Sequence, residues 1–77
     1  MATRQASEER TLRQFGLEVR AARVSLGLSQ EQLAELANFD RTYVSLVERG
    51  QRNLSLLNIC RLARALRTTP AALIGGL

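Results

Sequence analysis

Apolar residues recur every three or four positions along the first third of the chain, which is the spacing of an amphipathic helix. The residues on this expected buried face are Leu12, Phe15, Val19, Ala22 and Leu26. Ser7, followed by two glutamates, places a capping hydroxyl and negative charge where a first helical turn has unpaired N–H groups. Gly27 suits the left-handed position that ends a helix. The pattern predicts a helix that starts after Ser7, preceded by a mobile arm over residues 1–6.

Two shorter helices joined by a minimal turn are predicted next. Ser29 and Gln32 form a Ser-x-x-Gln capping box for the first of them. Asn38 tolerates a positive φ and can turn the chain, and Asp40 can cap the second helix. The apolar and small residues that would join the two helices are Leu33, Ala34, Ala37, Phe39, Val44 and Val47. Such a pair is typical of a helix-turn-helix, which presents its second helix outward.

Two further helices complete the predicted fold. Gly50 ends the third helix, and Ser55 caps a fourth, whose apolar face consists of Leu56, Ile59, Leu62, Ala63 and Leu66. Thr69 caps a last short helix with Pro70 at its first position, where the missing N–H costs nothing. Strand signals, internal repeats and linkers are absent. The sequence therefore predicts one all-α domain of five helices over residues 7–77.

The outward side chains of the third helix favour nucleic acid as the partner. They are hydrogen-bonding types suited to base edges and phosphates, namely Arg41, Thr42, Tyr43, Ser45 and Arg49. The 77 residues carry a net charge of +4, and all eleven basic residues are arginine, whose guanidinium group pairs well with phosphate and guanine. Charge alone does not decide the matter, because so small an excess is also found on ordinary solvated surfaces.

Composition excludes several other classes of function. Cys60 is the single cysteine and the chain has no histidine, so we expect no intrachain disulfide, no metal site and no cofactor, with Cys60 acting as a small buried hydrophobe. No apolar run approaches the ~20 residues that span a bilayer, and the N-terminus lacks a signal-peptide pattern, so we expect a cytoplasmic protein. An enzyme is poorly supported, because no catalytic constellation is present.

The stretch GLSQEQLAELANFDRTYVSLVERGQRNLSLLNICRLARAL resembles the Cro and lambda-repressor-like helix-turn-helix family, also called the xenobiotic-response-element type. Within it, FDRTYVSLVERGQRNLSL is similar to the controller proteins of restriction–modification systems. The resemblance implies a symmetric dimer joined through its C-terminal helices, with two recognition helices in successive major grooves of DNA. It also implies control of the protein's own gene and of the endonuclease gene.

The resemblance also implies roles for individual residues. The base-contacting set is Arg41, Thr42, Tyr43 and Ser45, with Arg41 expected to make a bidentate contact to guanine. The backbone-contacting set is Ser29, Gln30, Arg49, Arg52 and Asn53. Tyr43 has an alternative, in which its ring packs on the scaffold and only its hydroxyl reaches a phosphate. Glu48 matches an acid that pairs with an arginine of the first helix, here Arg23.

Other features allow two interpretations each. The apolar residues Leu57, Leu73, Ile74 and Leu77 either form the dimer interface or complete the monomer's own core and surface. Glu31 and Glu35 are either ordinary surface or an acidic patch for the sigma subunit of RNA polymerase. Arg67 stands where the family often has glycine, which puts the end of the fourth helix in question. The alternatives for the whole chain are a phage-type repressor and an antitoxin-like interaction module.

Overall fold

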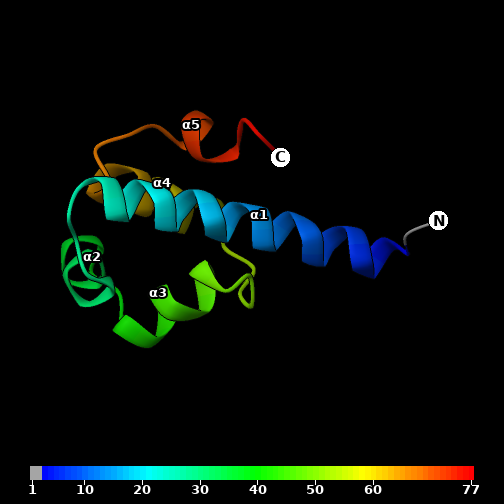
Figure 1. Cartoon of the computed structure of the whole chain (residues 1–77), viewed down its shortest axis with the longest axis horizontal. Helices are drawn as coiled ribbons and strands as arrows, with labels where there is room; N and C mark the ends of the chain where they lie inside the picture. The colour runs from blue at the N-terminus through cyan, green and yellow to red at the C-terminus, as the bar shows by residue number, and fades with distance from the viewer. Residues whose placement is uncertain (1–2) are drawn as a thin grey trace.

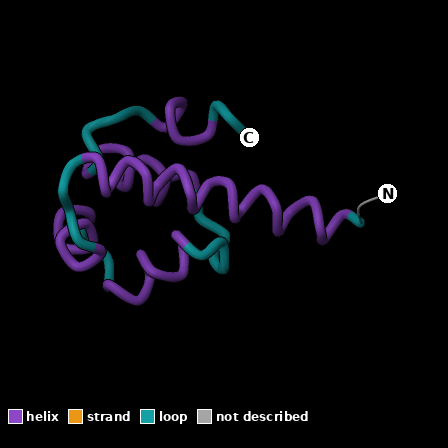
Figure 2. The backbone as a smooth tube through the Cα atoms, viewed as in Figure 1, coloured by secondary structure: helices purple, strands orange, loops and turns teal. Residues whose placement is uncertain are grey.

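The computed structural model describes residues 3–77, and this part of the chain is all-helical, as predicted, with no strand (Figures 1 and 2). Its five helices are α1 (Arg4–Ser25), α2 (Gln30–Ala37), α3 (Arg41–Glu48), α4 (Leu56–Ala65) and α5 (Pro70–Ile74). In Figure 1, α3 and α5 lie at opposite edges of the molecule, with α1 running between them and its N-terminal half projecting outward. None of the described helices combines the length and the apolar character needed to cross a membrane.

The first helix begins earlier than the sequence pattern predicts. Thr3 is its N-cap and accepts a hydrogen bond from the N–H of Ala6 at 3.0 Å, so residues 4–6 of the expected arm are helical. Ser7 lies inside the helix, where its carbonyl accepts from the hydroxyl of Thr11. The start assigned to Ser7 is therefore wrong, because Thr3 offers the same capping chemistry one turn earlier. Residues 1 and 2 of that arm lie outside the described residues.

One hydrophobic core joins all five helices. Its buried residues are Phe15, Val19, Leu33, Ala34, Ala37, Val44, Val47, Leu62, Ala63, Leu66 and Leu73. Two residues predicted to be buried are not: Leu26 is 40% exposed and Leu56 is 71% exposed. Both lie at a helix end: Leu26 is the C-cap of α1 and Leu56 is the first residue of α4.

The remaining helix ends follow the predicted signals, except at the start of α3. Asn38 is left-handed at φ 59°, as expected for the turn between α2 and α3. Asp40 occupies the N-cap position of α3, but its side chain makes no capping hydrogen bond, contrary to the prediction. Arg67 adopts φ 57° after α4, so this arginine takes the left-handed geometry that glycine adopts without strain.

Gly16 allows α1 and α3 to approach closely. It is buried, and a Cβ placed on it would lie 2.5 Å from the backbone carbonyl oxygens of both Val47 and Glu48. Those atoms belong to the backbone of the last turn of α3, so they cannot rotate away. Any larger residue at position 16 must push α3 outward.

We therefore expect Gly16→Ala to lower the free energy of unfolding by about 1–3 kcal/mol, the usual effect of overpacking a core. At roughly 4–8 °C per kcal/mol for a domain of this size, the melting temperature should fall clearly in a thermal scan. Gly76→Ala is the matched control, because a Cβ there meets nothing within 4 Å. Equal melting temperatures for the two variants would contradict the close approach.

Candidate nucleic-acid interface

The N-terminus of α2 is fixed by a complete capping box. The Ser29 hydroxyl accepts from the N–H of Gln32 at 3.0 Å, and the Gln32 side chain accepts from the N–H of Ser29 at 2.8 Å. Gln30 follows at the first helical position and is half-buried. Its Nε2 donates to Oε1 of Glu48 at 3.1 Å, so its amide is held against the end of α3.

Glu48 is the centre of a buried charged network. Arg23 donates from Nε to Oε2 of Glu48 at 2.6 Å and from Nη2 to Oε1 at 3.0 Å, which is a two-pronged ion pair. A third bond runs from Nη1 of Arg23 to the carbonyl of Leu28 at 2.7 Å. The side chains are 12% and 3% exposed, and the hydrogen bonds to Glu48 raise the pKa of Arg23. The two residues expected to pair therefore link α1, the loop before α2, and α3.

The outer face of α3 is built on a buried inner face. Val44 and Val47 are fully buried, whereas Arg41 and Thr42 are exposed and Ser45 is half-buried. The helix lies at an edge of the molecule (Figure 1), and the exposed Arg41 and Thr42 are open to solvent. The outer face of α3 can therefore offer hydrogen-bond donors and acceptors to a partner along the length of the helix.

Tyr43 does not stand free on this face. Its ring lies 4.6 Å from the ring of Phe39, centroid to centroid, and its hydroxyl accepts from Nδ2 of Asn58 at 3.0 Å. The side chain is half-buried, with the guanidinium of Arg52 5.6 Å from its ring centroid. This geometry matches the alternative in which the ring packs on the scaffold, because the phenol finds an aromatic neighbour and a donor on α4.

The loop after α3 extends the polar surface. Gly50 is left-handed at φ 72° and passes so close to the backbone of Arg13 that a Cβ there would lie 2.7 Å from its Cα. The following Gln51, Arg52 and Asn53 are all exposed. Arg49 is also exposed, and its Nε donates to the carbonyl of Ser45 at 3.3 Å. The segment from the start of α3 to the end of this loop thus carries three exposed arginines, namely Arg41, Arg49 and Arg52. This concentration of positive charge suits an anionic partner.

The residues assigned to the dimer interface separate into two groups. Leu57, Ile74 and Leu77 are exposed, Leu57 by 74%. Leu73 is 3% exposed and belongs to the chain's own core, so its side chain is not available to a partner. Leu56, which the sequence pattern placed in the core, adds to the exposed apolar surface of α4.

Sequence reasoning missed two polar residues of α4. Asn58 holds the hydroxyl of Tyr43, and Arg61 binds the carbonyl end of α2. They lie three residues apart, which places both on the same side of α4, beside its buried face. This spacing was the one feature of the sequence that could have indicated a shared role.

Comparison with known proteins identifies the class. A helix-turn-helix family model matches residues 19–73, which is more than half of the chain. The chain therefore belongs to the helix-turn-helix family of DNA-binding transcription regulators, as the sequence resemblance implied.

Particular relatives narrow the class. The chain is 46% identical to control protein C.BamHI of Bacillus amyloliquefaciens over 61 residues, which are 78% of this chain and 75% of that one. The crystal structure of the restriction–modification controller protein C.AhdI from Aeromonas hydrophila has a TM-score of 0.79 at 55% identity, covering 80% of this chain and 94% of that chain. The controller protein C.Esp1396I, solved as a tetramer in complex with its natural 35 base-pair operator, has a TM-score of 0.77 at 29% identity, covering 86% and 87%. This chain is thus homologous to restriction–modification controllers.

Proposed function

We propose that this chain is itself the controller of a restriction–modification system, a cytoplasmic regulator that binds a palindromic operator as a homodimer. The observation that carries the proposal is the exposed polar face of α3, which rests on a buried core and is followed by the exposed Arg49 and Arg52. Its similarity to C.AhdI and C.BamHI supports the biological setting. The proposal includes control of its own gene and of the endonuclease gene, and it assigns no catalytic activity, cofactor or metal.

The proposed roles follow from exposure and position. Arg41, Thr42 and Ser45 would read base edges in the major groove, with Arg41 on guanine O6 and N7. Tyr43, whose ring is packed, would offer its hydroxyl to the DNA backbone. The remaining backbone contacts would come from the N-terminal end of α2 and from the end of α3 with its loop, namely Ser29, Gln30, Arg49, Arg52 and Asn53.

Dimerisation would use the exposed leucine and isoleucine side chains of α4 and α5. Leu57 and Ile74 lie on two helices that pack against each other, and Leu77 follows at the C-terminus. Burying such side chains against a second copy is favourable by roughly 25 cal/mol per Å² of apolar surface. A two-fold dimer would place its recognition helices about 34 Å apart, one turn of DNA.

The proposed function is tested by selection from a randomised pool of duplexes with the purified chain. We expect enrichment of a palindrome, and its presence upstream of the chain's own gene beside methyltransferase and endonuclease genes would support the controller role. Failure to enrich any sequence would contradict sequence-specific binding.

We also propose that the exposed Glu31 and Glu35 of α2 contact RNA polymerase during activation. Both line one open depression with Asp40 and Arg41, so the acidic patch lies beside the start of the recognition helix. A surface beside the DNA-binding helix could be reached by an RNA polymerase subunit bound at a neighbouring promoter element.

Glu35→Lys should abolish activation of a reporter promoter, because it reverses the charge offered to a basic partner surface. Operator affinity, measured separately on the purified variant, should not fall. Glu9→Lys, an equal charge change on the exposed surface of α1, should leave activation intact. Parallel loss of activation and operator binding in Glu35→Lys would count against a polymerase contact.

A further inference from the structure

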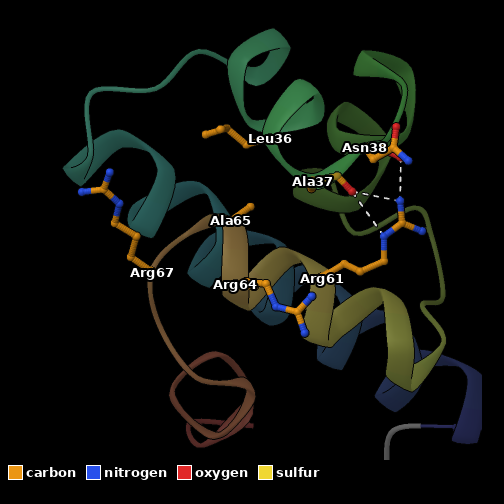
Figure 3. Close-up of a pocket in the computed structure, with 7 residues that line it drawn as sticks. All are labelled: Leu36, Ala37, Asn38, Arg61, Arg64, Ala65 and Arg67. Atoms are coloured by element: carbon orange, nitrogen blue, oxygen red, sulfur yellow. Dashed lines mark hydrogen bonds between the residues drawn. The ribbon is translucent and has the colours of Figure 1, made fainter.

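Arg61 joins α4 to the turn between α2 and α3. Its Nε and Nη2 donate to the carbonyl of Ala37 at 3.2 and 2.9 Å, and Nη2 also donates to the carbonyl of Asn38 at 2.6 Å (Figure 3). The same guanidinium lies 4.2 Å from the ring centroid of Phe39. The last carbonyls of a helix have no partner within it and carry partial negative charge, so a guanidinium is well suited to them.

A second contact from α4 holds the first turn of α3. Asn58, one turn before Arg61, donates to the hydroxyl of Tyr43 at 3.0 Å. Phe39 and Tyr43 are themselves one turn apart and their rings are in contact at 4.6 Å. Two residues of α4 therefore contact two aromatic residues, one in the turn and one in α3, whose ring planes are tilted by 38° to each other. We call these four residues the α4 clamp.

Val44 and Val47 anchor α3 in the core, but its first turn has little local support. The helix has only eight residues, and Asp40 provides no side-chain cap for its first turn. The exposed Arg41 and Thr42 belong to that turn, so no local hydrogen bond from the N-cap side chain fixes the backbone that carries them. A bidentate contact to a base needs placement within about 0.5 Å and 10–20°, whereas contacts to phosphates tolerate more.

We propose that Asn58 and Arg61 are positioning residues for DNA recognition: through Phe39 and Tyr43 they set the orientation of α3 that base discrimination requires. The inference rests on the proposed function, since it concerns how the same surface distinguishes one base pair from another. Loss of the clamp lets α3 tilt, which weakens the preference for the operator while leaving general attraction to DNA in place.

Arg64 provides a matched comparison on the same helix. It lies one turn after Arg61 and lines the same open depression of about 540 Å³ with Arg67 and Leu36 (Figure 3). Within the described residues its side chain makes no hydrogen bond or ion pair, and it is exposed. Removing Arg64 deletes one positive charge from α4 without touching the clamp, which separates positioning from simple attraction of phosphates.

The experiment measures the affinity of the full chain for two duplexes, the one that the wild-type chain enriches from a randomised pool and a scrambled duplex of equal length and composition. For Arg61→Ala we expect the ratio of the two affinities to fall roughly tenfold. This is the usual size of the effect when a substituted residue acts on a binding site without touching the ligand. Arg64→Ala should keep the ratio, and both variants should bind the scrambled duplex equally well. Arg61→Lys, which keeps the charge but loses the planar fork, should also lower the ratio.

Circular dichroism and a thermal scan establish that each variant is folded at the assay temperature. An unchanged ratio in folded Arg61→Ala would overturn the proposal and reduce Arg61 to a stabilising residue. Equal losses on both duplexes with a reduced dependence on salt would also overturn it, because that result indicates a direct phosphate contact. If Arg61→Ala does not fold, the same ratio is measured for Arg61→Lys and Asn58→Ala. A lowered ratio in these folded variants supports the proposal, and an unchanged ratio overturns it. A wild-type chain without any preference would instead overturn the proposed function.

Discussion

Glu48→Ala should unfold this domain well below the melting temperature of the parent chain. The substitution removes the buried carboxylate that accepts hydrogen bonds from both Arg23 and Gln30, and removing one partner of a buried ion pair typically costs about 3–5 kcal/mol. For a domain of 60–100 residues, each kcal/mol corresponds to roughly 4–8 °C. The measurement is thermal or urea unfolding followed by circular dichroism.

The control for this prediction is Glu35→Ala, which removes an exposed carboxylate of α2 that contacts no cation within the described residues. It should leave the free energy of unfolding nearly unchanged, since surface substitutions usually act within about 0.5 kcal/mol. Similar melting temperatures for Glu48→Ala and Glu35→Ala would show that the network of Arg23 and Glu48 does not stabilise the fold.

Arg41→Ala should weaken binding to the operator by about 1–3 kcal/mol and relax the choice of base at one position. The reason is that Arg41 is exposed at the start of α3, where a guanidinium can reach both acceptors of a guanine. The measurement is a set of titrations with duplexes that differ from the operator by one base pair at a time.

Arg52→Ala is the comparison for this second prediction. Arg52 lies in the loop after α3 and is expected to contact phosphates, so its loss should weaken binding to all duplexes by a similar factor. If Arg41→Ala also weakened every duplex equally, Arg41 would be a backbone contact and the assignment of base reading to it would be wrong.

The helix boundaries were predictable because their signals are local. The capping box of Ser29 and Gln32, the left-handed Asn38 and the Thr69–Pro70 start each depend on a few neighbouring residues, and each is present in the structure. The start of α1 was missed because Thr3 and Ser7 offer the same capping chemistry, so the local sequence does not distinguish between them. In the structure Thr3 is the N-cap.

Burial and long-range contacts were less predictable, because they depend on which elements meet. The periodicity of α4 placed Leu56 inward, yet its side chain is 71% exposed. Arg61 binds carbonyls 23 and 24 residues away in sequence, and Tyr43 bonds to Asn58 fifteen residues away. A pattern confined to one helix carries no information on such partners. The pair of Arg23 and Glu48 was expected only because the family resemblance implied it.

The most direct test of the central claim, that the exposed face of α3 reads a specific duplex, is a titration of the purified chain with its selected palindrome at several salt concentrations. We expect two chains per duplex, a steep linear fall of log affinity with log salt, and an affinity roughly a thousandfold or more above that for scrambled DNA. Equal affinity for the palindrome and the scrambled duplex at every salt concentration would contradict it.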